Sequence, residues 1–391
     1  MDLLLTNLQW ADGTEKIHGD LRIRKGVISD TGSILPTRND QTLDFRDHYA
    51  YPGFTNSHDH LEMNLYPRMG SPPYGNYTEW GKDIYRPTES PVREIQKVDI
   101  ADRLIWGGVK NMVSGVTTVA HHNPWQSLLG KKKFPVHVLD QVAWSHSLAF
   151  GKNNKTDFPK KSGIPYVIHA AEGVDAFAFG EVNQLMELGL LKKNTVLVHA
   201  IALSKKDKDL LSRMGCSVVW CPSSNLFLFD KTADIRELIK IIPVALGSDS
   251  TMTGSATLLD EMQCAFQTGW ITPRQIFDMV TSVPALIFNL PLPRISRGAV
   301  ADLVIAPRLH EDYFENLLHL KPSNITGVFL NGKLVFADAS VAAAQDLKFS
   351  FTLDGRGKKS TTDVKSLMTR MKQGVKIEIL QRNPLWKMFG A

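Results

Sequence analysis

Two histidines separated by a single residue, His58 and His60, follow a run of small and β-prone residues that begins at Tyr51. Side chains two positions apart on an extended strand project to the same face, so both imidazoles can reach one metal ion. Taken alone, the pair is also typical of two exposed strand histidines. Its interpretation therefore depends on the residues further along the chain.

Other metal-capable or acid–base side chains stand where short apolar runs end. These are His169 and Glu172 after Tyr166–Ile168, His199 after Val196–Val198, and Asp249 shortly after Val244–Leu246. Runs that are apolar on both faces are typical of buried parallel strands. In a (β/α)8 barrel the carboxyl ends of the strands build the active site, so we expect these side chains to meet at one mouth.

This set of side chains suits a catalytic divalent metal. A catalytic zinc or iron ion takes imidazole and carboxylate ligands and keeps one position open for water. The predicted ligands are His58, His60, His169 and Asp249. We expect one divalent ion, zinc first and iron second. No lysine stands at a strand end where a carbamate could bridge two ions, which disfavours a binuclear site.

Two further residues have the chemistry of catalysis. Glu172 lies three positions beyond His169 and can move protons between an activated water and a substrate. His199 ends the next predicted strand and can hydrogen-bond a developing oxyanion. Both are predicted to be catalytic.

Motifs over nearly the whole chain resemble the amidohydrolase superfamily, in the branch of cytosine, guanine and S-adenosylhomocysteine deaminases and triazine hydrolases. The resemblance implies the same four ligands, with Glu172 as proton shuttle and His199 orienting the substrate. It also implies that Asp249 accepts a proton from the attacking water. The motifs are Pro52–Leu61, Gly115–Val119, His169–Glu172, Val198–His199, Cys221–Asn225, Gly247–Asp249, Thr281–Ala285 and Ala301–Val304.

The predicted fold is α/β, a (β/α)8 barrel over residues 52–295. A small β-sandwich is expected from both termini, residues 1–51 and 296–391, ending in a helix near Val364–Lys372 and a strand at Val375–Leu380. One βα unit is abbreviated, because only about forty residues separate Asn123 from Pro165. The predicted barrel strands are Gly53–His58, Val116–Ala120, Val136–Val142, Tyr166–His169, Val196–His199, Ser217–Trp220 and Val244–Leu246.

Helices are predicted at Val174–Leu190, Lys205–Met214, Ala233–Ile241 and Leu258–Thr268. Ser204 with Asp207, and Thr272 with Gln275, have the spacing of capping residues at helix starts.

Substrate contacts are predicted from the loop after the first barrel strand and from two later positions. Tyr74, Trp80 and Arg86 can stack on or bond a planar ring, and His122 and Asn225 can line the pocket. The alternatives are that Trp80 packs in the core, that Arg86 is solvated, and that His122 is a hydrogen-bonded structural residue.

Asp59, between the two histidines, departs from the small or hydroxylated residue that the family often has there. We expect its side chain to point out of the barrel and to pair with a backbone amide or a basic residue. A supporting role behind the metal ligands is the alternative.

Composition restricts the class of protein. The chain has 391 residues, 43% of them hydrophobic, and a net charge of +5 that is spread rather than clustered, so a nucleic-acid partner is not expected. No stretch is long enough to span a membrane, the N-terminus lacks a signal pattern, and three cysteines fit a reducing compartment. We expect a cytoplasmic protein with a small-molecule substrate; a homo-oligomer is compatible with the resemblance.

The predicted activity is that of a metal-dependent aminohydrolase acting on a C–N bond of a small nitrogenous heterocycle. One alternative is hydrolysis of a cyclic amide or loss of a leaving group other than ammonia. The other is a non-catalytic binding protein, which the complete ligand set disfavours.

Overall fold

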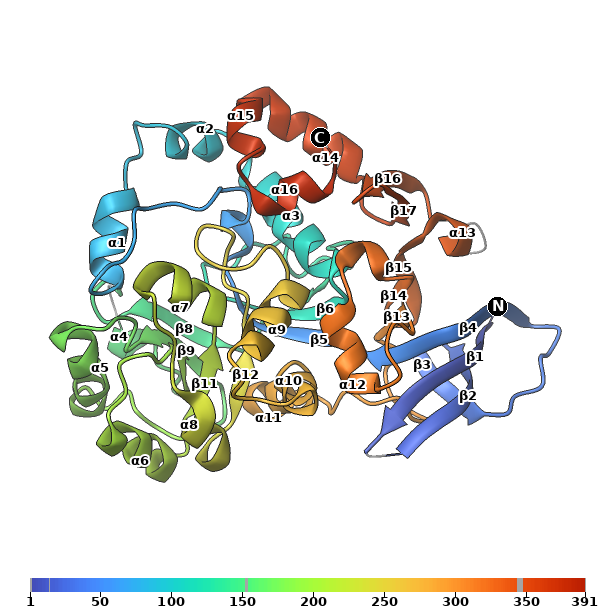
Figure 1. The fold of residues 1–391 in the computed structure, drawn as a ribbon, viewed down its shortest axis with the longest axis horizontal. Coiled ribbons are helices and arrows are strands. Elements are labelled where there is room, and N and C mark those ends of the chain that lie inside the picture. Colours follow the sequence, from blue (N-terminus) through green and yellow to red (C-terminus); the bar gives the residue numbers. More distant parts are fainter. Residues whose placement is uncertain (1, 14, 152–153, 343–346, 391) are drawn as a thin grey trace.

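The computed structural model describes residues 2–13, 15–151, 154–342 and 347–390, and its centre consists of parallel strands surrounded by helices (Figure 1). This confirms the predicted α/β class. The parallel strands are β5 (Phe54–Asp59), β6 (Val116–His121), β7 (His137–Val138), β8 (Ala143–Ser147), β9 (Tyr166–Ala170), β10 (Thr195–His199), β11 (Ser217–Trp220) and β12 (Val244–Leu246).

The parallel strands pair in two sheets, ordered β5-β6-β7 and β12-β11-β10-β9-β8. The residues after β12 lie against the end of β5, where the backbone N–H of Asp249 donates to the carbonyl of His58 at 3.0 Å. Strands buried on both faces need apolar residues at every position, and Val196, Leu197 and Val198 of β10 are all buried. The carboxyl ends of these strands therefore face a common region.

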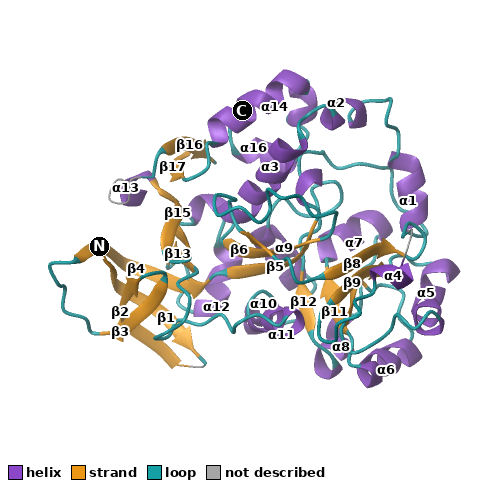
Figure 2. Cartoon of the chain, turned by 180° about the vertical axis from the view of Figure 1, so that it is seen from behind, coloured by secondary structure: helices purple, strands orange, loops and turns teal. Residues whose placement is uncertain are grey.

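Helices cover the outside of these sheets (Figure 2). The two predicted capping pairs are confirmed, since Ser204 with Asp207 and Thr272 with Gln275 each form a reciprocal capping box. The helices are α1 (Tyr77–Ile84), α2 (Val92–Gln96), α3 (Ile100–Val113), α5 (Ala176–Glu187), α6 (Lys205–Met214), α7 (Pro222–Phe229), α8 (Ile235–Ile241), α9 (Leu258–Gln267), α10 (Pro273–Met279) and α11 (Ser282–Phe288), with the short η1 (Leu61–Met63) after β5.

The segment between β6 and β9 is abbreviated. Strand β7 has two residues, and no helix separates it from β8 among the described residues. The prediction of one long strand over Val136–Val142 is wrong beyond Val138, because the chain leaves the sheet there and bends at the exposed Gln141. Only the short α4 (Asn154–Asp157) lies between β8 and β9 in the described part of the chain.

Strands from both ends of the chain share one nine-stranded sheet, ordered β16-β17-β15-β14-β13-β4-β1-β2-β3. Its two halves meet where β13 pairs with β4 in antiparallel register. All nine strands pair in a single sheet, so a sandwich of two layers stays a prediction. The strands are β1 (Asp2–Asp12), β2 (Glu15–Arg24), β3 (Val27–Gly32), β4 (Asp40–Pro52), β13 (Leu303–Pro307), β14 (Gly327–Leu330), β15 (Lys333–Asp338), β16 (Phe349–Leu353) and β17 (Arg356–Ser360).

The C-terminal segment is helical and lies beside α3 (Figure 1). The predicted strand at Val375–Leu380 is wrong, because Ile377–Leu380 forms α15, which buries Ile379 and Leu380, and only Val375, which follows α14, is extended. The remaining elements are α12 (Tyr313–Asn316), η2 (Leu317–His319), η3 (Pro322–Asn324), α13 (Ala339–Ala342), α14 (Val364–Gly374) and α16 (Pro384–Met388).

The cap of α16 ties this segment to the loop after β5. Asn383 is fully buried, and its amide donates to the carbonyls of Asn64 and Tyr66 at 2.9 and 2.7 Å. The C-terminal helices therefore help to fix the loop that follows the two histidines. Within the described residues, no helix is both long and apolar enough to cross a bilayer.

Helix α3 approaches the loop after β5 so closely that only glycine fits at Gly107. A Cβ atom there would lie 2.2 Å from the carbonyl oxygen of Leu61, the residue that follows His60. The histidine loop and α3 are therefore packed backbone to backbone.

We expect Gly107→Ala to destabilise the protein by about 1–3 kcal/mol, because the backbone of Leu61 must move. Gly180→Ala is the matched control, since the nearest atom to its Cβ is 3.6 Å away on Gln184 and alanine favours helix by about 0.5–1 kcal/mol. Melting temperatures measured by scanning calorimetry check both; an unchanged melting temperature for the Gly107→Ala protein would contradict the packing described here.

Candidate metal centre and active site

His58 and His60 project from the end of β5 toward Asp249, which follows β12. Their Nε2 atoms lie 3.9 and 3.7 Å from Oδ1 of Asp249. All three side chains are buried. The structure thus brings together the first two predicted ligands and the predicted carboxylate.

His169, at the end of β9, completes the predicted set. Its Nε2 lies 3.2 Å from Nε2 of His58, and its Nδ1 lies 2.6 Å from the carbonyl oxygen of His146. A carbonyl can only accept, so Nδ1 of His169 carries the hydrogen and Nε2 presents a lone pair. That lone pair is directed at the other predicted ligands.

His122 sets the tautomer of His58 in the same way. Its Nε2 must donate to the carbonyl of Ser145 at 2.8 Å, which leaves its Nδ1 as an acceptor. That acceptor faces Nδ1 of His58 at 3.3 Å. The N–H of His58 is therefore on Nδ1, and its Nε2 is left with a free lone pair.

A divalent cation fits this arrangement. Two lone pairs 3.2 Å apart repel unless a cation lies between them, and tetrahedral zinc separates its nitrogen ligands by about 3.3 Å. Burial, followed by the repulsion of neighbouring imidazoles, lowers the pKa of both His58 and His169, so these rings are neutral. Neutral imidazoles and a carboxylate are the ligand types that zinc and iron accept.

Asp249 is held in a strained backbone conformation. Its φ is +54°, in the left-handed region that non-glycine residues rarely adopt. Its carboxylate accepts from Oγ of Ser224 at 2.8 Å and Oγ1 of Thr253 at 2.9 Å. Burial opposes ionisation, but His60, His199 and the hydrogen bonds from the backbone of Ser250 and the hydroxyl of Ser224 lower the pKa of Asp249 overall, so the group is a carboxylate.

The turn before Asp249 requires a glycine. A Cβ atom on Gly247 would lie 2.7 Å from Cβ of His58. The strand that carries Asp249 therefore lies directly against the first histidine, which sets the spacing between the two predicted ligands.

Glu172 and His199 lie beside the predicted ligands. Nε2 of His199 is 3.6 Å from Oε1 of Glu172. Burial, together with repulsion from Asp249, raises the pKa of Glu172 well above its usual value, so this carboxyl group readily holds a proton. Such a group is suited to general acid–base chemistry.

Asn225 orients His199. Its Oδ1 accepts from Nδ1 of His199 at 2.8 Å, and its amide donates to Oγ1 of Thr232 at 3.2 Å. This directs Nε2 of His199 toward Glu172. His58, His169 and His199 also lie close enough to one another to form a second possible donor group.

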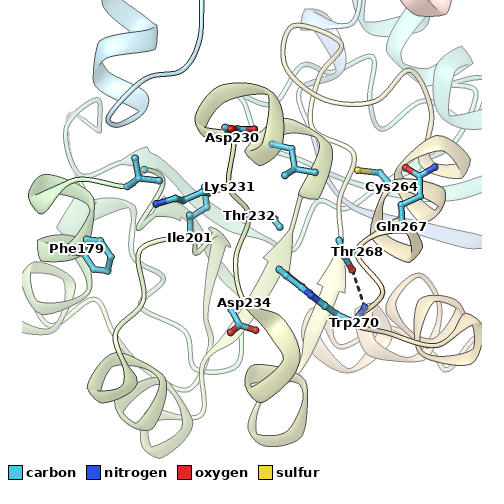
Figure 3. A pocket seen from close by; sticks show the side chains of 13 residues that line it. Phe179, Ile201, Asp230, Lys231, Thr232, Asp234, Cys264, Gln267, Thr268 and Trp270 are labelled. Carbon is cyan, nitrogen blue, oxygen red and sulfur yellow. Dashed lines mark hydrogen bonds between the residues drawn. The ribbon is translucent and has the colours of Figure 1, made fainter.

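A cavity of about 570 Å³ has Ile201, Thr232 and Trp270 among its lining residues (Figure 3). Thr232 lines it and connects it to His199 through Asn225. Val174, Ile201 and Leu226, which follow the site residues closely in sequence, also line the cavity. The four predicted ligands are not among its lining residues.

The other predicted substrate residues engage their own loop. The hydroxyl of Tyr74 donates to Asp83, and Arg86 bonds the carbonyl of Asp83 at 2.9 Å. The indole of Trp80 donates to the carbonyl of Met69 at 3.0 Å and packs partly buried on the core. These contacts favour the alternatives for Trp80 and Arg86 and hold Tyr74 within its own loop, and the structure does not bring the three together with the histidines.

His122 contacts the predicted ligands rather than open space. Both of its nitrogens face protein atoms, and its ring stacks on that of His169 with 4.4 Å between centroids. The structural alternative is favoured for this residue as well.

Several neighbours of the site were not predicted from the sequence. Ser224 and Thr253 bond Asp249, the carbonyl of His146 bonds His169, and Lys110 pairs with Asp59. Two signals in the sequence could have indicated the Asp59–Lys110 pair: an aspartate between two histidines and a lysine within the apolar run 104–113. Asp59 does pair with a basic residue, in agreement with the prediction, but it is fully buried.

Comparison with known proteins agrees with these observations. Residues 145–335 match the model of the amidohydrolase family. A 5-methylthioadenosine/S-adenosylhomocysteine deaminase of Pyrococcus furiosus is 23% identical, covering 85% of this chain and 94% of the relative. A 5'-deoxyadenosine deaminase of Methanothrix thermoacetophila is 25% identical, covering 73% of this chain and 80% of the relative.

Solved structures share the fold. An adenosine deaminase from Xanthomonas campestris with bound zinc superposes with a TM-score of 0.74 at 16% identity, covering 95% of this chain and 97% of that one. An atrazine chlorohydrolase from Arthrobacter aurescens in complex with zinc gives a TM-score of 0.70 at 15% identity, covering 95% and 99%. Residues 145–335 thus match the amidohydrolase family and the relatives over most of the chain are deaminases, in agreement with the resemblance to the amidohydrolase superfamily.

Proposed function

We propose that this protein is a metal-dependent aminohydrolase, which uses water to release ammonia from a carbon of a small nitrogenous heterocycle. The observation that carries the proposal is the convergence of three imidazoles and one carboxylate at the ends of β5, β9 and β12, with Glu172 beside them. The deaminase relatives make adenine nucleosides the first substrates to examine.

The proposed cofactor is one zinc ion held by His58, His60, His169 and Asp249, with iron as the second choice. A divalent metal would supply Lewis acidity and lower the pKa of water toward neutrality. Zinc in two solved neighbours of the same fold supports this choice.

The residues around the ligands would divide the remaining work. Glu172, whose pKa is raised by burial, would hold the proton taken from water and return it to the leaving nitrogen. His199, fixed by Asn225, would orient the substrate through its Nε2. Asp249 would accept a proton from the attacking water at a carboxylate oxygen.

Three broader expectations belong to the same proposal. The two parallel sheets would form a closed barrel of the (β/α)8 type, as the bond from Asp249 to His58 between the first and last strands supports. The protein would act in the cytoplasm, which the free thiols of Cys216, Cys221 and Cys264 support. A homo-oligomer stays a prediction.

A second candidate function is displacement of a leaving group other than ammonia. The shared fold with an atrazine chlorohydrolase favours it, because the same metal and the same proton-transfer residue would serve both reactions. Hydrolytic opening of a cyclic amide is a third outcome with the same site.

The test is elemental analysis of the purified protein together with a product screen over adenine nucleosides, other purines, pyrimidines, pterins and chlorinated triazines. We expect about one zinc per chain and ammonia from one ring class. Chloride release or ring opening without ammonia would select the alternatives. A zinc-loaded protein that transforms none of these compounds would contradict the proposal.

Glu172→Gln should retain the metal and lower kcat by about 10²–10⁴, because the amide cannot carry the proton. Asp249→Asn should lose metal and activity together, because it removes a ligand. Metal content and turnover of both variants are measured side by side. A Glu172→Gln protein as active as the parent would exclude Glu172 from proton transfer.

His122→Phe should weaken zinc binding by about 10–100-fold, because His58 loses the acceptor that fixes its tautomer while the ring stack on His169 is kept. The matched control is His146→Phe, since His146 hydrogen-bonds His169 through its backbone carbonyl and phenylalanine keeps a ring beside that of His169. Competition with a chromogenic chelator measures both affinities. Equal loss in the two variants would contradict the tautomer assignment.

A further inference from the structure

Lys110 is a fully buried lysine on α3, with a side chain that is 1% exposed. Lysine is almost never buried in this way unless its charge is paired. Its ammonium lies 2.7 Å from the carbonyl oxygen of Asp249, 2.9 Å from Oδ1 of Asn64 and 3.3 Å from Oδ2 of Asp59. Asp59 and Asp249 lie at the ends of β5 and β12, which carry three of the predicted metal ligands. Asn64 lies in the loop after β5.

The contact of Lys110 with Asp59 acts on the pair of histidines. Asp59 lies between His58 and His60 on β5, so its side chain points to the opposite face, toward α3. Its carboxylate also accepts from the amides of Asn64 and Asn111, each at 2.8 Å. With the side chain held at all these points, the strand cannot rotate, and the direction of both imidazoles is fixed.

The contact of Lys110 with the carbonyl of Asp249 acts on the carboxylate ligand. Asp249 has a left-handed backbone at φ +54°, which is unfavourable for a residue with a side chain. Its N–H donates to the carbonyl of His58 at 3.0 Å, and its own carbonyl accepts from Lys110. The strained residue is thus held from both sides.

From these contacts we propose that Lys110 is a positioning residue for the metal centre. One ammonium group holds the end of β5, through Asp59, and the end of β12, through the carbonyl of Asp249, at the separation that three of the four predicted ligands need. The inference rests on the proposed metal site. It assigns a role to the Asp59–Lys110 pair, which touches neither the predicted metal nor the substrate.

Lys358 provides a matched control for a purely structural role. It is also fully buried, it donates to the carbonyl of Ile325 at 2.7 Å, and it pairs with Asp338 at 2.5 Å. All of these residues belong to the C-terminal part of the nine-stranded sheet and the segment that precedes it, and none contacts the predicted ligands. Loss of its charge should therefore affect stability alone.

The experiment compares Lys110→Met, Lys358→Met and the unchanged protein. Zinc dissociation constants are measured by chelator competition, and the visible absorption spectrum is recorded after loading with cobalt. We expect Lys110→Met to bind zinc at least about tenfold more weakly and to change the cobalt spectrum, because the ligands lose their spacing. Lys358→Met should lower the melting temperature and leave the zinc constant and the spectrum unchanged.

If Lys110→Met does not fold, the double variant Asp59→Asn with Lys110→Met removes both charges at once and leaves no unpaired ion. It should fold and still bind zinc more weakly, because the carbonyl of Asp249 then loses its ammonium donor and keeps only the hydroxyl of Ser248 at 3.1 Å. Zinc affinity within about twofold of the unchanged protein, in whichever of these variants folds, would overturn the inference. An unchanged protein that binds zinc but releases no ammonia would refute only the proposed reaction, whereas one that binds no zinc would overturn both.

Discussion

The repulsion between buried, neutral imidazoles that present lone pairs to one another is the constraint on which the rest of the site depends. His58 and His169 face each other at 3.2 Å, and hydrogen bonds to His122 and to the carbonyl of His146 oblige both Nε2 atoms to be acceptors. A cation resolves this conflict, and the carboxylate of Asp249 adds the negative charge that attracts one. The neighbouring polar groups are arranged to keep these atoms in place.

Helix side chains with buried charges or titratable groups brace the strand-end motifs. Lys110 of α3 supports Asp59 and Asp249, Glu181 of α5 accepts from the backbone of Ala171 at 2.8 Å, and Glu261 of α9 accepts from the backbone of Ser223 at 2.9 Å. Burial raises the pKa of Glu181 to about 7 and that of Glu261 to about 8, so both are costly groups to place there. Such groups preorganise loops whose own backbone conformations are strained, as at Ala171 and Asp249.

Local signals made the central strands and helices predictable, and long-range contacts explain most of the errors. The strand before His169 and the helix Lys205–Met214 are encoded by short apolar runs and a capping box, which act within a few residues. Val375–Leu380 alternates like a strand, but Ile377–Leu380 forms a helix. Burial of Ile379 and Leu380 against the rest of the molecule outweighs the local pattern. The roles of Lys110 and His122 depend on partners that come near only in the folded chain. Their residue types could therefore suggest a role but could not identify the partners.

The most direct test of this account is anomalous diffraction at the zinc absorption edge from crystals of the purified protein. We expect one zinc ion per chain, with Nε2 of His58, His60 and His169 and a carboxylate oxygen of Asp249 each at about 2.0–2.2 Å. A zinc ion bound by His199 in place of His60 or Asp249, or crystals of active protein without any metal at these residues, would contradict it.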